Sequence, residues 1–409
     1  MLRLPLKYNW ADWADKIGLL SIFLILTTNL LLPESLGITR LENILLPLLI
    51  VAVLGVGTFT SNKTIIYTLI TLFVVTVFSN FLNLKGLEAY INSVRYIKYI
   101  LLFLITGHLI KKNSATIHSM IDVFVIVLIV INLIQIFNPF GWGEDLLRTY
   151  SNHIQNYEIN KVFNRRFRLF GTQNNPNNNA MIWGMLFFYY YLKNKMERDF
   201  WNYSVIFFSL VFLFLTQSRT SLVGVVFSFV VYFFIKNFSL KTTLILFGGG
   251  FLGIVLLKVS GLSYMQQLLT TNPLEIHSFQ LRYQAWSALI DLWLEYPMFG
   301  LGLETNYEEM IGMAPDNEFL FFIASGGALF IIPYLFLFIA MLVIGFKNLK
   351  STNSFYGLYI LLPLFLLLNS ITNYSLNNVK VATFLFILLA LVNENFEKNE
   401  EKDINFIGC

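Results

Sequence analysis

Cysteine, histidine and charged residues are all scarce in this chain of 409 residues. A single cysteine, Cys409, excludes an intramolecular disulfide and a metal site built from several thiolates. The histidines are scattered without the spacing of zinc ligands. They are His108, His118, His153 and His277. We therefore expect the protein to work without a metal and without another cofactor.

Charge is the second scarcity. Charged residues make up 13% of the chain, about half the share in an average globular protein. Hydrophobic residues make up 56% and aromatic residues 17%, and the mean hydropathy is +0.65. Because a soluble fold of this length would expose far more polar surface, lipid is the expected solvent for most of the chain. The net charge of +4 forms no basic block, so the sequence gives no indication of nucleic-acid binding.

Apolar runs long enough to cross a bilayer recur along the whole chain. A spanning helix needs about 20 mainly apolar residues. The runs do not alternate as barrel strands do, so we expect helices throughout. The predicted fold is thus all-α, a single integral membrane domain over 1–409. Its twelve predicted spans are 17–33, 41–59, 64–84, 91–110, 120–138, 177–193, 202–218, 220–236, 241–258, 318–346, 355–373 and 378–393.

Lysine and arginine in the short connections predict the orientation, because cytoplasmic loops collect them. The connections on one side of the membrane are rich in lysine and arginine, whereas those on the other side hold only Arg40, Lys85 and Lys380. The richer side, with both termini and a tail at 394–409, is therefore predicted to be cytoplasmic. The long segments 139–176 and 259–317 are predicted to lie outside. The cytoplasmic set is Lys63, Lys111, Lys112, Lys193, Lys195, Arg198, Lys236, Lys241, Lys347 and Lys350.

Candidate anion-binding residues gather at the predicted outer side. Residues 165–179 combine arginines, whose rigid forks suit phosphate, with asparagines that suit sugar hydroxyls; an interfacial positive cluster with a polar turn is the alternative. Arg219, between two spans, is either an anion site or a snorkelling residue. Arg95 and Lys98 lie one turn apart, which favours a lipid phosphate between them; snorkelling, or pairing with Glu88, is the alternative.

The second outer segment carries a further motif. A helix is predicted from Asn272-Pro273 to Pro297, lying on the bilayer surface, and Gly300 and Gly302 predict a flexible turn after it. Asp316 opens the next span. It is either a helix cap, favoured by the helix dipole, or an acid/base group at the outer face.

These motifs, in this order, resemble the O-antigen ligase/polymerase superfamily, which consists of bacterial envelope glycosyltransferases with a multi-span helical fold of the GT-C type. The resemblance covers most of residues 91–345. The residues that carry it are Arg168-x-x-Gly171…Pro176-Asn177, Ser218-Arg219, Arg282…Trp286…Pro297-x-x-Gly300-x-Gly302 and Asp316-Asn317…Gly326.

The resemblance implies a donor glycan on undecaprenyl pyrophosphate at the outer leaflet of the bacterial inner membrane, transferred without a metal. Arg168, Arg219 and Arg282 would neutralise the leaving pyrophosphate, and Asp316 would act as base toward the acceptor. Other expected substrate contacts are Arg95, Lys98, Arg166, Gly171, Asn177, Gly300, Gly302 and Asn317.

One departure from the family pattern decides the preferred function. Ligases of the superfamily carry His-Asn where this chain has Asp316-Asn317, and the Asp-Asn form is more similar to Wzy-type repeat-unit polymerases. We therefore expect a polymerase of O-antigen, capsule or exopolysaccharide, with a chain-length regulator and a flippase as partners. Two alternatives stay open: a ligase that transfers glycan to lipid A core, and a flippase or other transporter of lipid-linked oligosaccharides.

Overall fold

The structure, a computed structural model, describes residues 10–33, 38–56, 62–150, 168–173, 175–236, 277–302, 307–312 and 316–393. Over these ranges the regular secondary structure is helical throughout, without a strand. The helices are α1 (Trp10–Leu26), α2 (Ile38–Val56), α3 (Lys63–Leu82), α4 (Leu87–Ser93), α5 (Arg95–Phe137), α6 (Trp142–Tyr150), α8 (Pro176–Met196), α9 (Phe200–Leu215), α10 (Arg219–Lys236), α13 (His277–Glu295), α14 (Tyr307–Ile311), α15 (Glu318–Lys347), α16 (Leu358–Ser370) and α17 (Val379–Ala390). A π-helical turn, η1 (Thr27–Leu31), extends α1.

Several of these helices are suited to lipid. Within the described ranges, five are long and apolar enough to cross a bilayer: Trp10–Leu31, Lys63–Leu82, Leu87–Phe137, Arg219–Lys236 and Glu318–Lys347. Four shorter apolar helices accompany them. The all-helical membrane architecture is therefore confirmed, whereas the count of twelve spans and the GT-C type stay predictions. The predicted span 241–258 lies outside the described residues.

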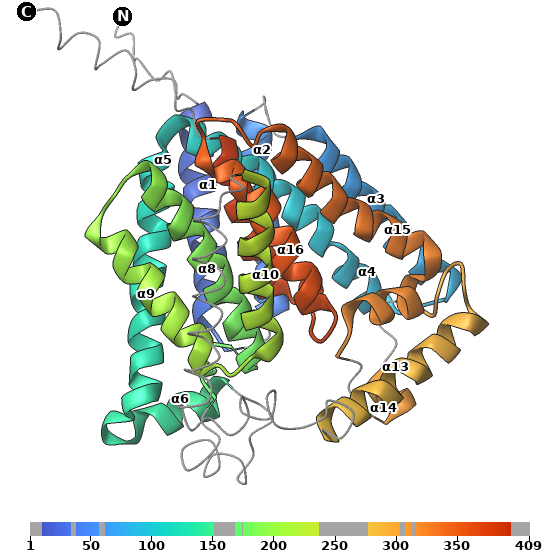
Figure 1. Cartoon of the computed structure of the whole chain (residues 1–409). Coiled ribbons are helices and arrows are strands. Elements are labelled where there is room, and N and C mark those ends of the chain that lie inside the picture. The colour runs from blue at the N-terminus through green and yellow to red at the C-terminus, as the bar shows by residue number, and fades with distance from the viewer. Residues whose placement is uncertain are drawn as a thin grey trace, which may run out of the picture.

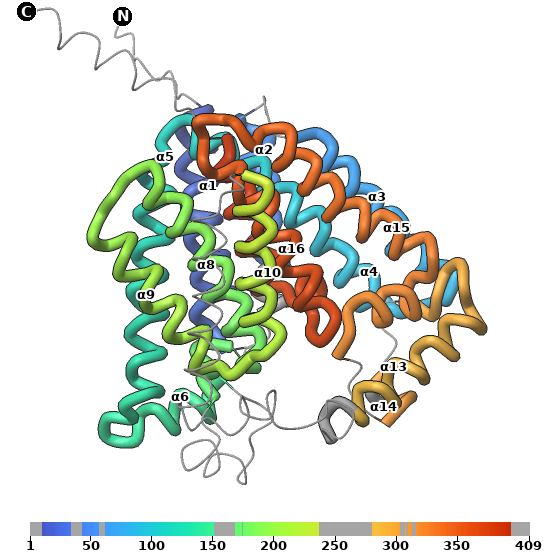
Figure 2. The backbone as a smooth tube through the Cα atoms, in the orientation of Figure 1, coloured from blue at the N-terminus to red at the C-terminus, as the bar shows by residue number. Residues whose placement is uncertain are grey.

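Helix α5 differs from its prediction. The predicted spans 91–110 and 120–138 fall into one helical run of 43 residues that is broken at Asn113, where φ is −154° and ψ is 83°. The segment predicted to connect them is helical on both sides of this break. Figures 1 and 2 show the chain rising through the first half of α5 and descending through the second. The two spans thus form a helical hairpin, as their order predicted, but without a loop.

Asparagine side chains start four of the helices. Asn62, Asn175, Asn317 and Asn378 each accept a hydrogen bond from a backbone N–H in the first turn of α3, α8, α15 and α17. Such caps satisfy donors that have no partner inside the helix. Pro176 directly follows the cap of α8, a position where proline costs no hydrogen bond. The ends of these helices are therefore fixed by local sequence.

Helices α8, α16 and α17 form the centre of the bundle. Nearly every residue of α17 and most of α8 are buried, as expected for helices that are apolar on all sides. The neighbouring pairs include α1 with α2, α8 with α9, α10 with α16, and α3 with α15. On the outside, large apolar side chains stay exposed, such as Leu54 (75%), Phe207 (62%) and Ile332 (63%). A surface of this kind fits a lipid environment.

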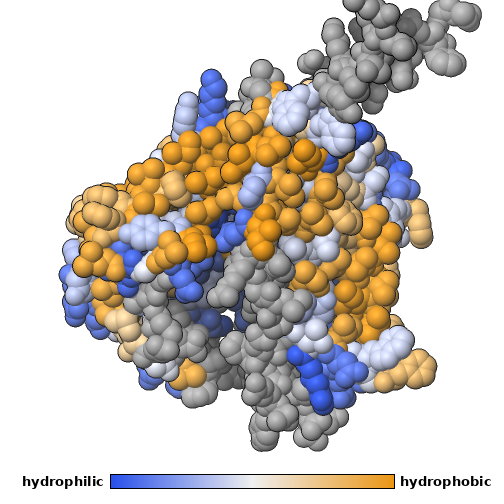
Figure 3. Space-filling view, turned by 180° about the vertical axis from the view of Figure 1, so that it is seen from behind, coloured by the Kyte–Doolittle hydropathy of each residue, from blue (hydrophilic) through white to orange (hydrophobic). Residues whose placement is uncertain are grey.

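The helices alternate in direction, so their ends form two polar layers. In Figure 1, α8 and α10 end and α9 begins at the upper end of the bundle, whereas α10 and α15 begin at the lower end, on the side of α6, α13 and α14. Figure 3, seen from behind, shows hydrophobic residues over the upper and middle parts of the surface and hydrophilic residues around a hollow lower down. We call the layer with α6, α13 and α14 the α13 end. Its position outside the cytoplasm remains a prediction.

Candidate functional site

Arg168 lies in a corner between α8 and α9 at the α13 end. Its Nε donates a hydrogen bond of 2.9 Å to the carbonyl of Thr216, and its Nη2 donates one of 2.7 Å to Oδ1 of Asn177. The nearby Gly171 has a φ of +59°, and the amide side chain of Gln135 binds both its N–H and its C=O. The guanidinium is therefore held by a rigid support. Arg166 lies outside the described residues.

Arg219 follows Thr216 by three residues and begins α10, so the corner that holds Arg168 also holds Arg219. A cavity of about 240 Å³ opens beside it, lined by Arg219, Thr220, Val223, Leu368 and Ile371. Val223 and Ile371 are 57% and 40% exposed, so the cavity wall faces the lipid side. The cavity therefore combines one cation with apolar walls at a helix start.

Arg282 and Asp316 come together, a contact that the sequence analysis did not predict. Arg282 Nη2 lies 3.5 Å from Asp316 Oδ2, joining α13 to the residue two before α15. The side chains are 21% and 41% exposed. Arg282 Nε is buried and has no hydrogen-bond partner among the described residues. A buried donor without a partner is costly, and an anionic ligand would satisfy it.

The capping alternative for Asp316 does not hold. Asn317, one residue later, caps α15, because its Oδ1 accepts a 3.0 Å hydrogen bond from Leu320 N–H. Asp316 has a φ of +30°, outside the helix, and its carboxylate is turned to Arg282. Asp316 therefore remains a candidate acid/base group. A sugar contact of Asn317, like that of Asn177, remains a prediction.

Arg95 and Lys98 have separate surroundings although they lie one turn apart. Arg95 Nε donates to the carbonyl of Asn92 at 2.7 Å, and Nη1 donates to Asn377 Oδ1 at 2.7 Å. Lys98 is only 2% exposed, with its ammonium 5.3 Å from the ring centroid of Tyr99. Snorkelling does not describe Lys98, because its side chain is enclosed. A shared lipid phosphate remains a prediction, and Arg95 is the more accessible of the two.

Gly300 and Gly302 belong to a turn whose backbone is held in place. Leu301 N–H and Gly302 N–H donate to the carbonyls of Ala324 and Ser325 at 2.9 and 2.8 Å. These carbonyls lie just before Gly327, where α15 is broken. Both turn glycines have positive φ, and a Cβ on Gly300 would lie 2.3 Å from the Ser325 carbonyl carbon. The predicted flexibility is therefore wrong: these glycines allow two backbones to touch. Whether they also contact substrate stays a prediction.

The connection between α16 and α17, residues 371–378, was missed by the sequence analysis. Thr372 Oγ1 lies 2.7 Å from Thr220 Oγ1, beside Arg219. At the far end of the connection, Asn377 accepts from Arg95 and its N–H donates at 2.6 Å to Oε1 of Glu318. The connection thus links the surroundings of Arg219 and Arg95. Its three asparagines, with Thr372 and Ser375, are unusual between two apolar helices and were the available signal.

Glu318 was also missed as a functional candidate. It is fully buried, and its Oε2 accepts hydrogen bonds from Tyr334 (2.6 Å) and Ser370 (2.7 Å). Asn377 N–H binds the other oxygen. A carboxylate in an enclosed site needs such donors. It stands two residues after Asp316, so the same stretch of chain supplies one exposed and one buried carboxylate.

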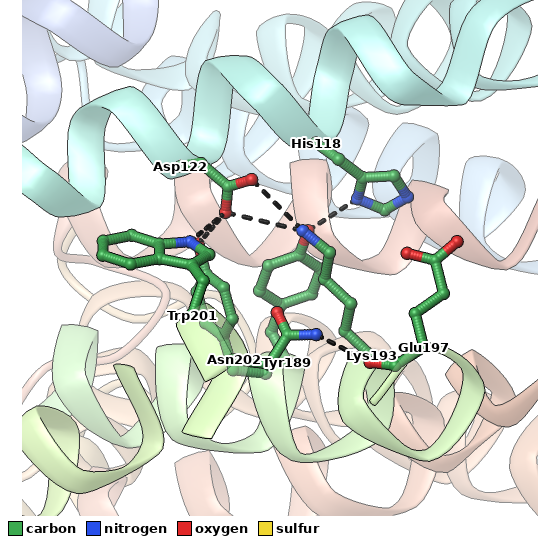
Figure 4. Close-up of polar contacts among 8 residues, drawn as sticks. His118, Asp122, Tyr189, Lys193, Glu197, Trp201 and Asn202 are labelled. Atoms are coloured by element: carbon green, nitrogen blue, oxygen red, sulfur yellow. Dashed lines mark hydrogen bonds and ion pairs between the residues drawn. The ribbon is translucent and has the colours of Figure 1, made fainter. Parts of the chain in front are cut away.

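A second polar cluster lies between α5, α8 and α9 (Figure 4). Asp122 is at its centre: Lys193 Nζ approaches Oδ2 at 3.2 Å, Trp201 Nε1 donates to Oδ1 at 3.0 Å, and Tyr190 also binds Oδ1. His118 Nδ1 lies 2.6 Å from the Tyr189 hydroxyl. We call these residues the Asp122 cluster. It contains none of the residues predicted to bind substrate.

Comparison with known proteins bears on the α13 end. Residues 204–334 match a protein-family model described as O-antigen ligase. The match supports the O-antigen ligase/polymerase superfamily. It contains Arg219, Arg282 and Asp316, and it does not distinguish polymerase from ligase. None of the curated proteins matches the chain.

The match is consistent with a membrane glycosyltransferase-like enzyme that handles glycans. Among the residues that the structure describes, no three His, Cys, Asp or Glu side chains gather as metal ligands. Independence from metal nevertheless stays a prediction, as does the chemical identity of the donor.

Proposed function

We propose that this protein is a polysaccharide polymerase that transfers a growing glycan from undecaprenyl pyrophosphate to another lipid-linked repeat unit at the outer face of the inner membrane. The observation that carries the proposal is the pair Arg282–Asp316, with an unsatisfied buried donor on the arginine, inside the segment that matches the O-antigen ligase family. A phosphate would satisfy Arg282 and leave the Asp316 carboxylate for the acceptor hydroxyl.

In the proposed reaction, the carboxylate of Asp316 and the two arginines Arg282 and Arg219 have different roles. The acceptor hydroxyl attacks the anomeric carbon of the donor, the bond from that carbon to the phosphate oxygen breaks, and pyrophosphate leaves on the lipid. Asp316 takes the proton of the hydroxyl. Arg282 and Arg219 stabilise the negative charge that develops on the leaving oxygen. Such charge stabilisation is strongest where water is excluded.

The cavity beside Arg219 supports a lipid-linked donor. It is lined by the apolar residues Val223, Leu368 and Ile371 together with Arg219 and Thr220. An isoprenoid chain would lie against the apolar wall with its pyrophosphate at the arginine. The distribution of charge argues against the transporter alternative. In transporters of known type, charged groups lie at the bilayer midplane on broken helices, whereas Arg95 and Arg219 are the first residues of α5 and α10 and Asp316 lies two residues before α15.

The test is the glycan profile of a deletion strain complemented with variants of this chain. Arg282→Ala is expected to give single repeat units and no long chains, with the protein still present in the membrane. Arg148→Ala is the matched control, because Arg148 is an exposed arginine of α6 at the same end. Normal chain lengths with Arg282→Ala would refute the site.

The same strain distinguishes the alternatives. A polymerase defect leaves one repeat unit attached to the final acceptor. A ligase defect leaves long glycan on the lipid carrier and none on the acceptor. A flippase defect leaves lipid-linked units on the cytoplasmic side. Transfer in vitro from a lipid-linked donor to either repeat units or lipid A core would then identify the acceptor.

A further inference from the structure

The buried carboxylate of Glu318 has no place in the reaction described above. It is 0% exposed, so it cannot touch a substrate. Its hydrogen-bond donors come from three places: Tyr334 on α15, Ser370 at the end of α16, and the backbone of Asn377 in the connection to α17. Enclosing an acidic group in a membrane domain is unfavourable, and such groups mark functional sites more often than packing sites.

The contacts continue from Glu318 to Arg95. Glu318 Oε1 accepts a hydrogen bond of 2.6 Å from the backbone N–H of Asn377. The side-chain Oδ1 of Asn377 in turn accepts one of 2.7 Å from Arg95 Nη1. Asn92 holds Arg95 Nε by its carbonyl at 2.7 Å. The guanidinium is therefore held at Nε and at Nη1, which donate to two different residues. The remaining nitrogen, Nη2, makes no hydrogen bond to the described residues and stays available for an anion.

We propose that Glu318 is a positioning residue that, through Asn377, orients the Arg95 guanidinium toward the phosphate of a second substrate lipid. The proposal rests on the proposed function, because it assigns Arg95 to the lipid-linked acceptor. The N–H groups of a planar guanidinium have fixed directions, so Nη2 can donate to a phosphate only when the guanidinium plane is held in the correct orientation. Asn377 supplies that direction, and the carboxylate keeps Asn377 in place.

The test is a double-mutant cycle on the purified full-length protein, with transfer measured against the concentration of lipid-linked acceptor. Glu318→Gln is expected to raise KM for the acceptor about ten-fold, the effect of losing one charge-assisted hydrogen bond. Arg95→Ala should raise KM at least as much, and kcat should change little in either variant. The double variant should be no worse than Arg95→Ala alone.

Two further variants separate positioning from simple packing. Tyr334→Phe removes a donor to the other carboxylate oxygen and leaves the Asn377 contact in place; it should lower thermal stability and change KM less than two-fold. Asn377→Ala cuts the connection without altering the carboxylate and should raise KM as Glu318→Gln does. Asn377→Ala therefore tests the same contact even if Glu318→Gln does not fold.

Independent effects of Glu318→Gln and Arg95→Ala that multiply in the double variant would overturn the proposal. An equal KM change in Tyr334→Phe would do so as well. Failure of the proposed function is visible separately, since Arg282→Ala would then leave transfer unchanged. If Arg282→Ala abolishes transfer while Glu318→Gln and Asn377→Ala leave KM unaltered, only the role of Glu318 is refuted.

Discussion

The α13 end and the Asp122 cluster both place arginine or lysine beside a carboxylate, but they satisfy these charges to different degrees. In the Asp122 cluster the carboxylate receives Lys193, Trp201 and Tyr190 together (Figure 4). At the α13 end, the Arg282–Asp316 pair is wider, 3.5 Å, and leaves Arg282 Nε buried without a hydrogen bond among the described residues.

We interpret this difference as one between a structural ion pair and a candidate binding site. A buried charge whose donors and acceptors are all matched stabilises one packing of the helices, and a further ligand has nothing to gain there. An unmatched donor costs stability in the free protein, and a ligand recovers that cost when it binds. The comparison therefore predicts that damage at the α13 end reduces activity, whereas damage at the Asp122 cluster reduces stability.

The largest expected effect is on Arg219. Replacing it by alanine removes the one cationic residue among those that line the cavity, and loss of one charge-stabilising group costs about 100-fold or more in kcat. Transfer per folded molecule, with folding checked by size-exclusion chromatography in detergent, measures this effect. Arg198→Ala is the control, as an arginine in the connection between α8 and α9. Equal activities of Arg219→Ala and Arg198→Ala would contradict the claim that arginines at the α13 end have a special role in transfer.

Next in size is the effect of Asp122→Ala. Lys193, with 11% of its side chain exposed, would lose its partner, and the unfolding free energy should fall by about 2–3 kcal/mol. Thermal unfolding of the purified protein measures this change, with Asp122→Asn as the milder variant because its amide oxygen still accepts hydrogen bonds. Activity per folded molecule should be retained. A 100-fold loss of activity would assign the Asp122 cluster to the reaction.

A smaller effect is expected from Gly327→Ala. Gly327 has a φ of +64° and a ψ of −163°, and a Cβ there would lie 2.2 Å from the Met298 carbonyl carbon. The strain should cost about 1–3 kcal/mol and displace the turn that α15 holds. Unfolding temperature and glycan chain length measure the two consequences. Gly86→Ala is the control, because nothing lies within 4 Å of its Cβ position; equal destabilisation by both would contradict the close contact.

Local signals predicted much of the architecture. Apolar runs located α3, α10 and α15 to within a few residues, and Pro297 marked the end of α13. The hairpin of α5 was predicted from its two runs, but the missing loop was not, since the break at Asn113 depends on how the two halves pack. The cap of α15 was assigned to Asp316 as one alternative and belongs to Asn317, because two neighbouring polar residues both suit that position.

The site was predicted in part, for a similar reason. Arg168, Arg219, Arg282 and Asp316 were predicted from short polar motifs and from the resemblance to the O-antigen ligase/polymerase superfamily. The structure joins Arg282 to Asp316 and places Arg168 beside the start of α10. Glu318 stood in the same motif but was passed over. Its burial comes from α16 and from residues 375–377, more than 50 positions away, and no local pattern encodes such a contact.

The sequence alone determined the solvent, the helices and the residue types at their ends, because transfer into lipid and helix capping depend on composition over about 20 residues. Tertiary structure decided which of those polar residues are satisfied. Asp122 receives hydrogen bonds from a donor on α9, and Glu318 receives them from Ser370 of α16 and from Asn377, whereas Arg282 keeps a buried nitrogen unmatched among the described residues. That distinction depends on hydrogen-bond geometry between distant segments, and it is what separates the candidate site from the other charges in the chain.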